Sequence, residues 1–362
     1  MRTLKFIPLL FLCIFLSGSY GQGVKTEKRL SQLNNPINKA LGNYKRLLTG
    51  KLKEDLKIAN NIMSWQFKNG AFFKSSESFY KRKANEAEKA ANEKKNRYLG
   101  CLDNNATSME LMLLADVYKR GKNKKHKQAA QKAFEFILKA QYSSGGWPQY
   151  YPKRSKDSYS NHATFNDNAM MRVMVLMQKA YLKKAPFDSD ILNEDQRNAA
   201  KEAVNKGIDF ILKSQIVMNG KKTIWCAQHG MNDYKAKAAR SYELASKSGC
   251  ESVLILAFLM SRPQTPEISS SVKAGLNWFR NPANYMENYA FDGSKDNPIM
   301  FKKGSRMWFR FYELETNKGF FCNRNGVATY KIMEVEKERR NGYAWGGNWP
   351  EKLLKYAKSV GY

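Results

Sequence analysis

The chain has 362 residues, of which 43% are hydrophobic and 13% are aromatic. This aromatic content excludes intrinsic disorder for most of the chain, and the length suits one large domain or two small ones. Lysine and arginine number 62 against 32 acidic residues, so the formal net charge is +30. A charge of this size indicates a polyanionic partner or substrate, although lysines that only coat a solvated surface would give the same value.

The N-terminus has the layout of a cleavable secretory signal over residues 1–21. Arg2 and Lys5 precede an apolar run of 11 residues, Phe6–Leu16, and small residues at positions 19 and 21 fit cleavage before Gln22. The run is too short to span a bilayer, and no second run of about 18 apolar residues follows it. We therefore expect an exported protein without a membrane segment, located in the periplasm, on the cell surface or in the medium.

Residues 22–362 are predicted to form one domain, with residues 22–50 as a helical extension at its N-terminus. A weak repeat runs through this domain: a segment with apolar residues at helical spacing recurs about every 70 residues. Its four copies, which we call the A helices, are Ile58–Gln66, Lys132–Gln141, Lys206–Gln215 and Lys273–Arg280. Loops rich in glycine and aromatic residues accompany these copies.

A second set of helices, the B helices, is predicted after these loops. The set consists of Asn105–Arg120, Asn168–Lys183, Glu251–Met260 and Val327–Lys337. A charged, alanine-rich helix, Phe79–Arg97, is expected within the first loop. Asp103, Asp167 and Asn325 stand just before B helices, where short polar side chains can cap free N–H groups.

Helix pairs that repeat in this way predict the fold. Strand patterns are short and sparse, and nothing alternates strand and helix as a doubly wound sheet would. We expect an all-α fold, an (α/α) toroid in which helical hairpins form a partial ring with long A-to-B loops and little strand. In such a ring the A-to-B loops would gather on one face, where several repeats could contribute to one site.

The cysteines and histidines do not indicate a zinc knuckle, a histidine-rich metal site or a disulfide scaffold. Outside the signal segment the cysteines are Cys101, Cys226, Cys250 and Cys322, with no Cys-x-x-Cys spacing. The sequence leaves open whether any two of them form a disulfide. With only three histidines in the chain, a histidine-rich metal site or a Ser-His-Asp triad is a poor explanation of function.

The A-to-B loops carry carboxylates and arginines. Asp103 and Asp167 occupy matching places in successive repeats, so we expect them to converge, and with asparagine amides they would offer the oxygen ligands that Ca²⁺ prefers. The alternative is that both only cap helices. Arg240 and Arg324 lie in the loops of the third and fourth repeats and would suit an acidic ligand, or form structural ion pairs. Trp147 would stack on a sugar ring, or pack in the core.

Ordered motifs along residues 50–350 resemble those of polysaccharide lyase family 10 pectate lyases. The motifs are Asp103–Thr107, Gly145–Pro148, Phe165–Met170, Ile224–Gln228, Ala239–Glu243 with Glu251–Ser252, Phe311–Leu314, Cys322–Gly326 and Arg340–Trp345. Each motif alone is weak, whereas the ordered set is specific. The resemblance implies the α/α toroid and an enzyme, a pectate lyase, that cleaves polygalacturonate by calcium-assisted β-elimination.

The resemblance also implies residue roles at positions that match the family's motifs. Arg240 would be the catalytic base, and Arg324 would bind a substrate carboxylate. The implied calcium ligands are Asp103, Asn104 and Asp167. The further implied substrate-binding residues are Asn323, Trp147 and Tyr242. The chain departs from the family pattern at Asn69–Lys74, where a Gly-Gly-Trp-Pro-like motif is usual, and at His229–Lys235.

β-Elimination needs no nucleophile, which agrees with the scarcity of histidine. A base removes the C5 proton beside the uronate carboxylate, and the 4-O-glycosidic bond breaks to leave a 4,5-unsaturated end. Calcium and an arginine would neutralise that carboxylate and so lower the pKa of the C5–H bond. Arginine is normally protonated, so its use as a base is implied by the resemblance alone.

The same residues fit two other functions. Asp103 and Asp167 could serve as the acid and base of a glycoside hydrolase that acts on acidic polysaccharides. The charge would also suit a non-catalytic protein that binds polyanions, but no nucleic-acid-binding motif is present and export argues against nucleic acid. The expected partner is therefore an acidic polysaccharide, polygalacturonate, and the expected state is a monomer.

Overall fold

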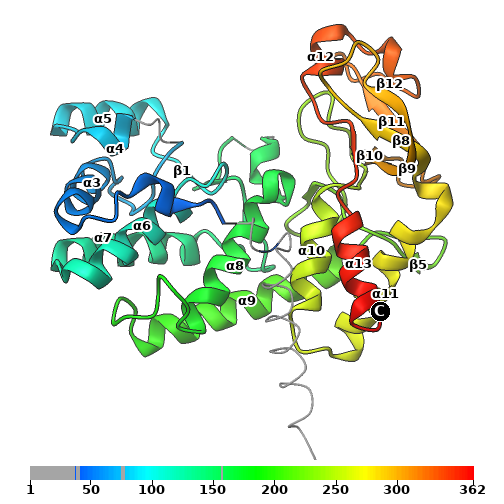
Figure 1. Ribbon diagram of the computed structural model, residues 1–362. Coiled ribbons are helices and arrows are strands. Elements are labelled where there is room, and N and C mark those ends of the chain that lie inside the picture. The colour runs from blue at the N-terminus through cyan, green and yellow to red at the C-terminus, as the bar shows by residue number, and fades with distance from the viewer. Residues whose placement is uncertain (1–36, 38–40, 75–77, 156–157) are drawn as a thin grey trace, which may run out of the picture.

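The computed structural model describes residue 37 and residues 41–74, 78–155 and 158–362 (Figure 1). The expected signal, residues 1–21, and most of the expected helical extension, residues 22–50, lie outside these residues. The described part of that extension contains one short 3-10 helix, η1 (Tyr44–Leu47).

The predicted helix pairs form much of the described structure. The A helices are α3 (Leu52–Ser64), α7 (Lys124–Lys139), α9 (Glu194–Ser214) and α11 (Pro266–Arg280). Three B helices are confirmed as α6 (Ser108–Gly121), α8 (Ala169–Tyr181) and α10 (Glu251–Met260). Each B helix packs on the A helix that follows it, and the pairs run in chain order from one side of the molecule to the other (Figure 1). Their apolar faces share one large core.

The expected charged helix is two helices, α4 (Ser78–Lys81) and α5 (Glu86–Lys95). The break lies at Asn85, whose side chain accepts a hydrogen bond from the Glu88 N–H while the Glu88 carboxylate accepts one from the Asn85 N–H. Such a reciprocal capping box fixes the first turn of a new helix. The sequence pattern predicted the helical character here but not the break.

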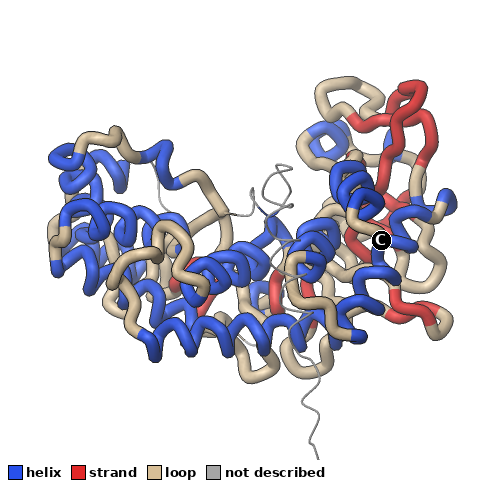
Figure 2. The backbone as a smooth tube through the Cα atoms, turned by 60° about the horizontal axis from the view of Figure 1, so that its bottom comes forward, coloured by secondary structure: helices blue, strands red, loops and turns tan. Residues whose placement is uncertain are grey.

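The fold is not all-α: it mixes helix and sheet, so the prediction of an all-helical toroid was wrong. The short strands are β1 (Gly100–Cys101), β2 (Tyr150–Tyr151), β3 (Ala163–Thr164), β4 (Val217–Met218), β5 (Lys221–Lys222), β6 (Gln228–His229), β7 (Lys247–Ser248), β10 (Phe311–Tyr312), β12 (Ala328–Thr329) and β13 (Gly346–Gly347). The longer strands are β8 (Met286–Phe291), β9 (Ile299–Phe309) and β11 (Gly319–Cys322). They form antiparallel sheets in the orders β13-β9-β8 and β12-β11-β10-β7, with three further two-stranded pairs. Figure 2 shows strands gathered at one end of the molecule.

The strand-rich end also replaces the fourth predicted B helix. Residues 327–337 form β12, the 3-10 helix η5 (Ile332–Glu334) and only the start of α12 (Lys337–Asn341), and α13 (Glu351–Ser359) follows. Val327, Thr329 and Tyr330 are β-branched or aromatic and favour an extended backbone over a helix. Pairing of β12 with β11 then outweighs the weak helical spacing that the sequence shows.

A glutamine that follows the end of each of the first three A helices by one or two residues ties neighbouring repeats together. Gln66, Gln141 and Gln215 each donate two hydrogen bonds from the side-chain amide, one to a carbonyl in the following loop and one to a carbonyl of the next A helix. The carbonyls of the next A helices belong to Ala129, Ala203 and Ser271. The repeated sequence pattern therefore encodes a repeated contact, which we call the glutamine clamp.

Three tryptophans have a second repeated role. The indole N–H groups of Trp147, Trp225 and Trp308 donate to carbonyls of α7, α9 and α11, at 2.9, 2.7 and 3.2 Å. Trp147 is completely buried, so its ring has no face on which a sugar could stack, and its assignment as a substrate-binding residue was wrong. A loop glycine allows this close packing: Gly145 has φ +100°, and a Cβ there would lie 2.0 Å from the Lys206 carbonyl oxygen.

The four cysteines Cys101, Cys226, Cys250 and Cys322 are all free thiols, so none of them pairs with another. Within the described part of the chain, no helix is both long enough and apolar enough to cross a membrane.

Candidate active site

Two equivalent loops place Asp103 and Asp167 before α6 and α8. Both loops hold non-glycine residues in the left-handed backbone region, with φ +50° at Asn104 and +50° at Asp167. The N-cap residues of the two helices are Thr107 and Asn168, and neither makes a side-chain capping bond. Asp103 and Asp167 therefore do not cap these helices, and the strained loops are of the kind that proteins maintain at functional sites.

Asp103 is 2% exposed and is held from several sides. One carboxylate oxygen, Oδ1, accepts the Asn104 N–H at 2.7 Å, and Oδ2 accepts the Gln149 side-chain amide at 2.9 Å. The ammonium group of Lys74 lies 3.1 Å from Oδ2. Asn104 itself is exposed beside this carboxylate.

Asp167 is more open, with a side chain 51% exposed. Partial desolvation by the surrounding protein raises its pKa, and the nearby carboxylates of Asp103, Glu251 and Glu243 add to the effect, while Arg310 opposes it. Arg310 reaches both acidic neighbours: its Nη2 lies 2.6 Å from Glu251 Oε1 and 3.9 Å from Asp167 Oδ1. The guanidinium group of Arg172 donates to the backbone carbonyl of Leu102 at 3.4 Å and to that of Asp167 at 2.9 Å. The structure thus places the loops of Asp103 and Asp167 side by side, as their repeat positions predicted.

The donor set at this place fits a hard cation. Asp103 and Asp167 offer carboxylate oxygens and Asn104 offers an exposed amide. The pKa of Asp167 is raised first by desolvation and then by the neighbouring carboxylates, and a bound cation would oppose both effects. Among the described residues, no group of three or more histidine, cysteine or acidic side chains is arranged to hold a metal ion by itself.

Arg240 forms a two-point ion pair with Glu243. Its Nε lies 2.7 Å from one carboxylate oxygen and its Nη2 lies 2.5 Å from the other. These bonds raise the pKa of Arg240, despite partial burial that would lower it. Burial would raise the pKa of Glu243, but the bonds and charge of Arg240 lower it. Both groups are thus charged in this structure.

The ring of Tyr242 gathers three arginines. The guanidinium carbons of Arg240, Arg324 and Arg339 lie 4.8, 5.6 and 3.6 Å from its centroid. Arg324 also forms a two-point ion pair with Glu338 and is half exposed. Arg240 and Arg324 are therefore neighbours, although each is paired with its own carboxylate. Tyr242 is only 6% exposed, so its ring packs against these arginines and has little surface left to contact a sugar.

Asn323 has its side chain occupied by the backbone of its own segment. Its amide donates to the Glu334 carbonyl at 3.1 Å, and its oxygen accepts the Glu336 N–H at 2.9 Å. These bonds fix the loop that carries Arg324. The geometry therefore gives Asn323 a direct part in shaping the loop.

The sequence did not single out several residues that link the two parts of the site. Tyr343 donates from its hydroxyl to Glu243 Oε1 at 2.9 Å, and the guanidinium carbon of Arg310 lies 4.9 Å from the Tyr343 ring. With the Arg310 contacts described above, a continuous network joins Asp167 to Arg240. Tyr343 and Glu243 fall inside recognised motifs and Arg310 precedes one, but motif membership alone does not assign them a role.

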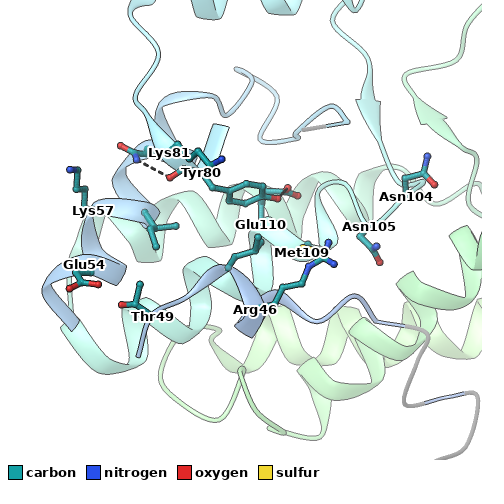
Figure 3. Close-up of a pocket in the computed structure, with 13 residues that line it drawn as sticks. Arg46, Thr49, Glu54, Lys57, Tyr80, Lys81, Asn104, Asn105, Met109 and Glu110 are labelled. Atoms are coloured by element: carbon teal, nitrogen blue, oxygen red, sulfur yellow. Dashed lines mark hydrogen bonds between the residues drawn. The ribbon is translucent and has the colours of Figure 1, made fainter. Parts of the chain in front are cut away.

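A cavity of about 710 Å³ lies beside the first loop, between η1, α3, α4 and α6 (Figure 3). Asn104 and Asn105 line one part of it, and Arg46, Lys57 and Tyr80 line the remainder with other residues. The Tyr80 hydroxyl donates to Glu110 at 2.7 Å in its wall. The loop that carries Asp103 thus borders both the carboxylates of Asp103 and Asp167 and this cavity.

Comparison with known proteins agrees with this geometry. The model of the pectic acid lyase family matches residues 66–354. A mutant of family 10 polysaccharide lyase from Cellvibrio cellulosa, solved in complex with trigalacturonic acid, is similar at 40% identity and a TM-score of 0.78, covering 94% of this chain and 99% of that one. A second structure of the Cellvibrio cellulosa enzyme is 41% identical with the same TM-score, covering 94% of this chain and 98% of that one. No curated protein matches. The chain belongs to the pectic acid lyase family, and it is a pectate lyase.

Proposed function

We propose that the chain cleaves polygalacturonate by calcium-assisted β-elimination at the network that joins Asp103 and Asp167 to Arg240. The observation that carries the proposal is the placement of two carboxylates and several arginines, from loops far apart in sequence, around one place. An acidic sugar could there meet a cation and guanidinium groups together. The related enzyme in complex with trigalacturonic acid supports an oligogalacturonate as the ligand.

Calcium would be held by Asp103, Asn104 and Asp167, with a substrate carboxylate completing its ligands. When bound, it would withdraw charge from the uronate carboxylate and so acidify the C5 proton. Two arginines would bind carboxylates of the polymer, each by donating two hydrogen bonds to one carboxylate. They are Arg310, which lies beside Asp167, and Arg324, which lies on the loop fixed by Asn323. These residues would orient the sugar ring toward Arg240.

Arg240 would take the C5 proton, the electron pair of that bond would form the C4–C5 double bond, and the 4-O-glycosidic bond would break. The departing oxygen would take a proton from water. The Glu243 ion pair holds Arg240 protonated in the free enzyme, so the proton must leave before Arg240 can act as base. Neighbouring positive charges oppose protonation, and Arg324 and Arg339 surround the same tyrosine ring. A cation-rich, partly desolvated surrounding is the condition under which an arginine base is physically reasonable.

Incubation with polygalacturonate, with and without a calcium chelator, tests the proposal. We expect an absorbance increase from the unsaturated uronate product that stops with chelator and returns with added calcium. Reducing sugar released without that absorbance would instead identify a glycoside hydrolase. Binding without turnover would identify a polyanion-binding protein.

Three accompanying properties belong to the same proposal. The signal-like segment at residues 1–21 supports export, and the family match across most of the remaining chain supports one catalytic domain. The mature enzyme is proposed to act as a monomer on polymer outside the cytoplasm. Size-exclusion chromatography with light scattering checks the monomer, and N-terminal sequencing of the exported protein checks cleavage before Gln22.

A further inference from the structure

Arg339 differs from the other arginines around Tyr242 because, among the described residues, no carboxylate forms a salt bridge with it, although the charge of Glu243 acts on it from a distance. It is 6% exposed, and its Nε and Nη2 have no hydrogen-bond partner among the described residues. Arg240 and Arg324, by contrast, each hold a carboxylate in a two-point pair. A buried guanidinium with unpaired N–H groups costs free energy of folding, so its presence beside Arg240 suggests a role in function.

Two aromatic rings hold this guanidinium in place. Its central carbon lies 3.6 Å from the centroid of Tyr242 and 3.9 Å from that of Tyr343, with Trp345 at 5.5 Å. Stacking of this kind stabilises the cation without neutralising its charge. The Arg339 side chain is thus a fixed positive charge in a partly desolvated place.

The charge lies close to Arg240. Both guanidinium carbons are measured from the same Tyr242 centroid, at 3.6 and 4.8 Å, so their separation cannot exceed the sum of these distances. Arg339 is buried and the Arg240 side chain is 43% exposed, so the two like charges interact across a partly solvated space. Burial lowers the pKa of Arg339, and the charge of Arg240 lowers it further, which shows that the two guanidinium groups repel each other. The other groups that face Arg240 are Glu243, Tyr242, Tyr343 and Arg324 with its partner Glu338.

We propose that Arg339 is a positioning residue for the lyase reaction: its charge, held between Tyr242 and Tyr343, opposes protonation of Arg240 and so counteracts the Glu243 ion pair. Glu243 orients Arg240 but favours the guanidinium form that cannot accept a proton. Arg339 favours the deprotonated form of Arg240, and it does so without contacting the sugar. The catalytic consequence rests on the proposed function of Arg240 as base, whereas the electrostatic effect at position 240 does not.

A thiol placed at position 240 measures that effect directly. Arg240→Cys introduces a group with an ordinary pKa of about 8.5, which can be followed through the pH dependence of alkylation by iodoacetamide. The native thiols interfere little, because burial raises the pKa values of all four, that of Cys101 to about 12. Removing a nearby positive charge raises a thiol pKa, since the thiolate loses a stabilising partner.

In the Arg240→Cys background, we expect Arg339→Met to raise the thiol pKa by about one unit. Arg339→Lys keeps the charge, so it should change the thiol pKa by no more than about a third of the shift that Arg339→Met causes. Arg262→Met is the matched control: Arg262 also has an unpaired Nε and lies 5.9 Å from each of two rings, Tyr181 and Phe258, but belongs to the segment after α10. It should leave the thiol pKa unchanged.

An unchanged thiol pKa in folded Arg339→Met, or an equal rise in Arg339→Lys and Arg339→Met, would overturn the proposal. Thermal melting checks folding, and Arg339→Gln takes the place of Arg339→Met should that variant not melt cooperatively. With Arg240 intact, Arg339→Met should lower kcat about tenfold with little change in KM, while Arg339→Lys should keep most of it. A thiol shift without this kcat loss would retain the charge effect at position 240 and overturn the role of Arg339 in the lyase reaction, whereas Arg240→Lys tests Arg240 as the base separately.

Discussion

Arg240 and Arg324 lie over the same tyrosine ring but have different surroundings, and substitutions should separate their roles. Arg240→Lys should reduce kcat by far more than tenfold, because lysine keeps the charge but moves the nitrogen and loses the planar fork. Arg324→Ala should raise KM as well as lower kcat, since a carboxylate contact serves both the ground and the transition state. Steady-state kinetics on polygalacturonate compares the two.

A retained kcat above about one tenth in Arg240→Lys, a barrier change under about 1.4 kcal/mol, would make Arg240 a binding residue. The base would then be sought at Lys235 or Lys237 in the same loop. Lys237 is already engaged, since its ammonium group lies 2.6 Å from Asp233.

Asp167 should control the calcium requirement. Asp167→Ala should remove most activity and leave the remainder insensitive to ordinary calcium concentrations, and zinc should be a poor substitute at an all-oxygen site. The raised pKa of Asp167 sets a pH dependence: a proton competes with calcium as the pH falls through that pKa. Apparent calcium affinity should therefore begin to fall at a higher pH than for a carboxyl group with the ordinary value of 3.8.

Calorimetric titration with calcium across pH measures this competition. The same calcium dependence in Asp167→Ala and the parent enzyme would contradict the assignment. Asp188→Ala is a suitable control, because Asp188 pairs with Lys119 on another surface of the molecule.

At the residue scale, the sequence could predict that the two aspartates lie close together, but not which side chains contact them. Matching repeat positions placed Asp103 and Asp167 together correctly. The arginines that face them could not be assigned in the same way, because Arg310 meets Glu251 across 59 residues and Asn166 across 144. Contacts at such separations depend on how whole segments dock, which local patterns do not encode.

At the element scale, the glutamine clamp should stabilise the junction between repeats. Gln141→Ala removes the donor to the Gly145 and Ala203 carbonyls, and loss of such bonds costs about 1–3 kcal/mol of unfolding free energy. Gln128, exposed on α7, is the control, and Gln128→Ala should change the free energy by less than about 0.5 kcal/mol. Urea unfolding followed by circular dichroism measures both. Equal midpoints would show that the clamp adds nothing.

Helices and strands differed in how far the sequence revealed them. Apolar spacing over whole turns predicted α7, α8 and α9 because each buries a continuous face, and a continuous apolar run predicted α10, which is buried on all sides. The β8–β9 hairpin escaped prediction because its strands are half exposed and lack clean alternation, with a register shift between Glu287 and Tyr289. Many other strands are only two residues long and form where loops meet, so no local propensity marks them.

At the scale of the whole molecule, the net charge of +30 should accelerate encounter with the polymer. Raising the salt from about 20 to about 300 mM shortens the Debye length from roughly 20 to 6 Å, so kcat/KM on polygalacturonate should fall severalfold. Stopped-flow and initial-rate measurements at fixed free calcium test this. Equal kcat/KM at both salt concentrations would assign the lysines to solubility alone.

The glutamine clamps have a consequence for how the enzyme loses activity. Each clamp reaches only the next A helix, so cooperativity passes between nearest neighbours, as in repeat proteins. The site, however, takes Asp103, Asp167, Arg240 and Arg324 from four successive loops. The enzyme is therefore active only while the junctions between all of these repeats are intact. The loss of activity on heating then follows the junction with the lowest stability. Heat inactivation should precede the loss of helix signal, and amide exchange should locate the junction that opens first.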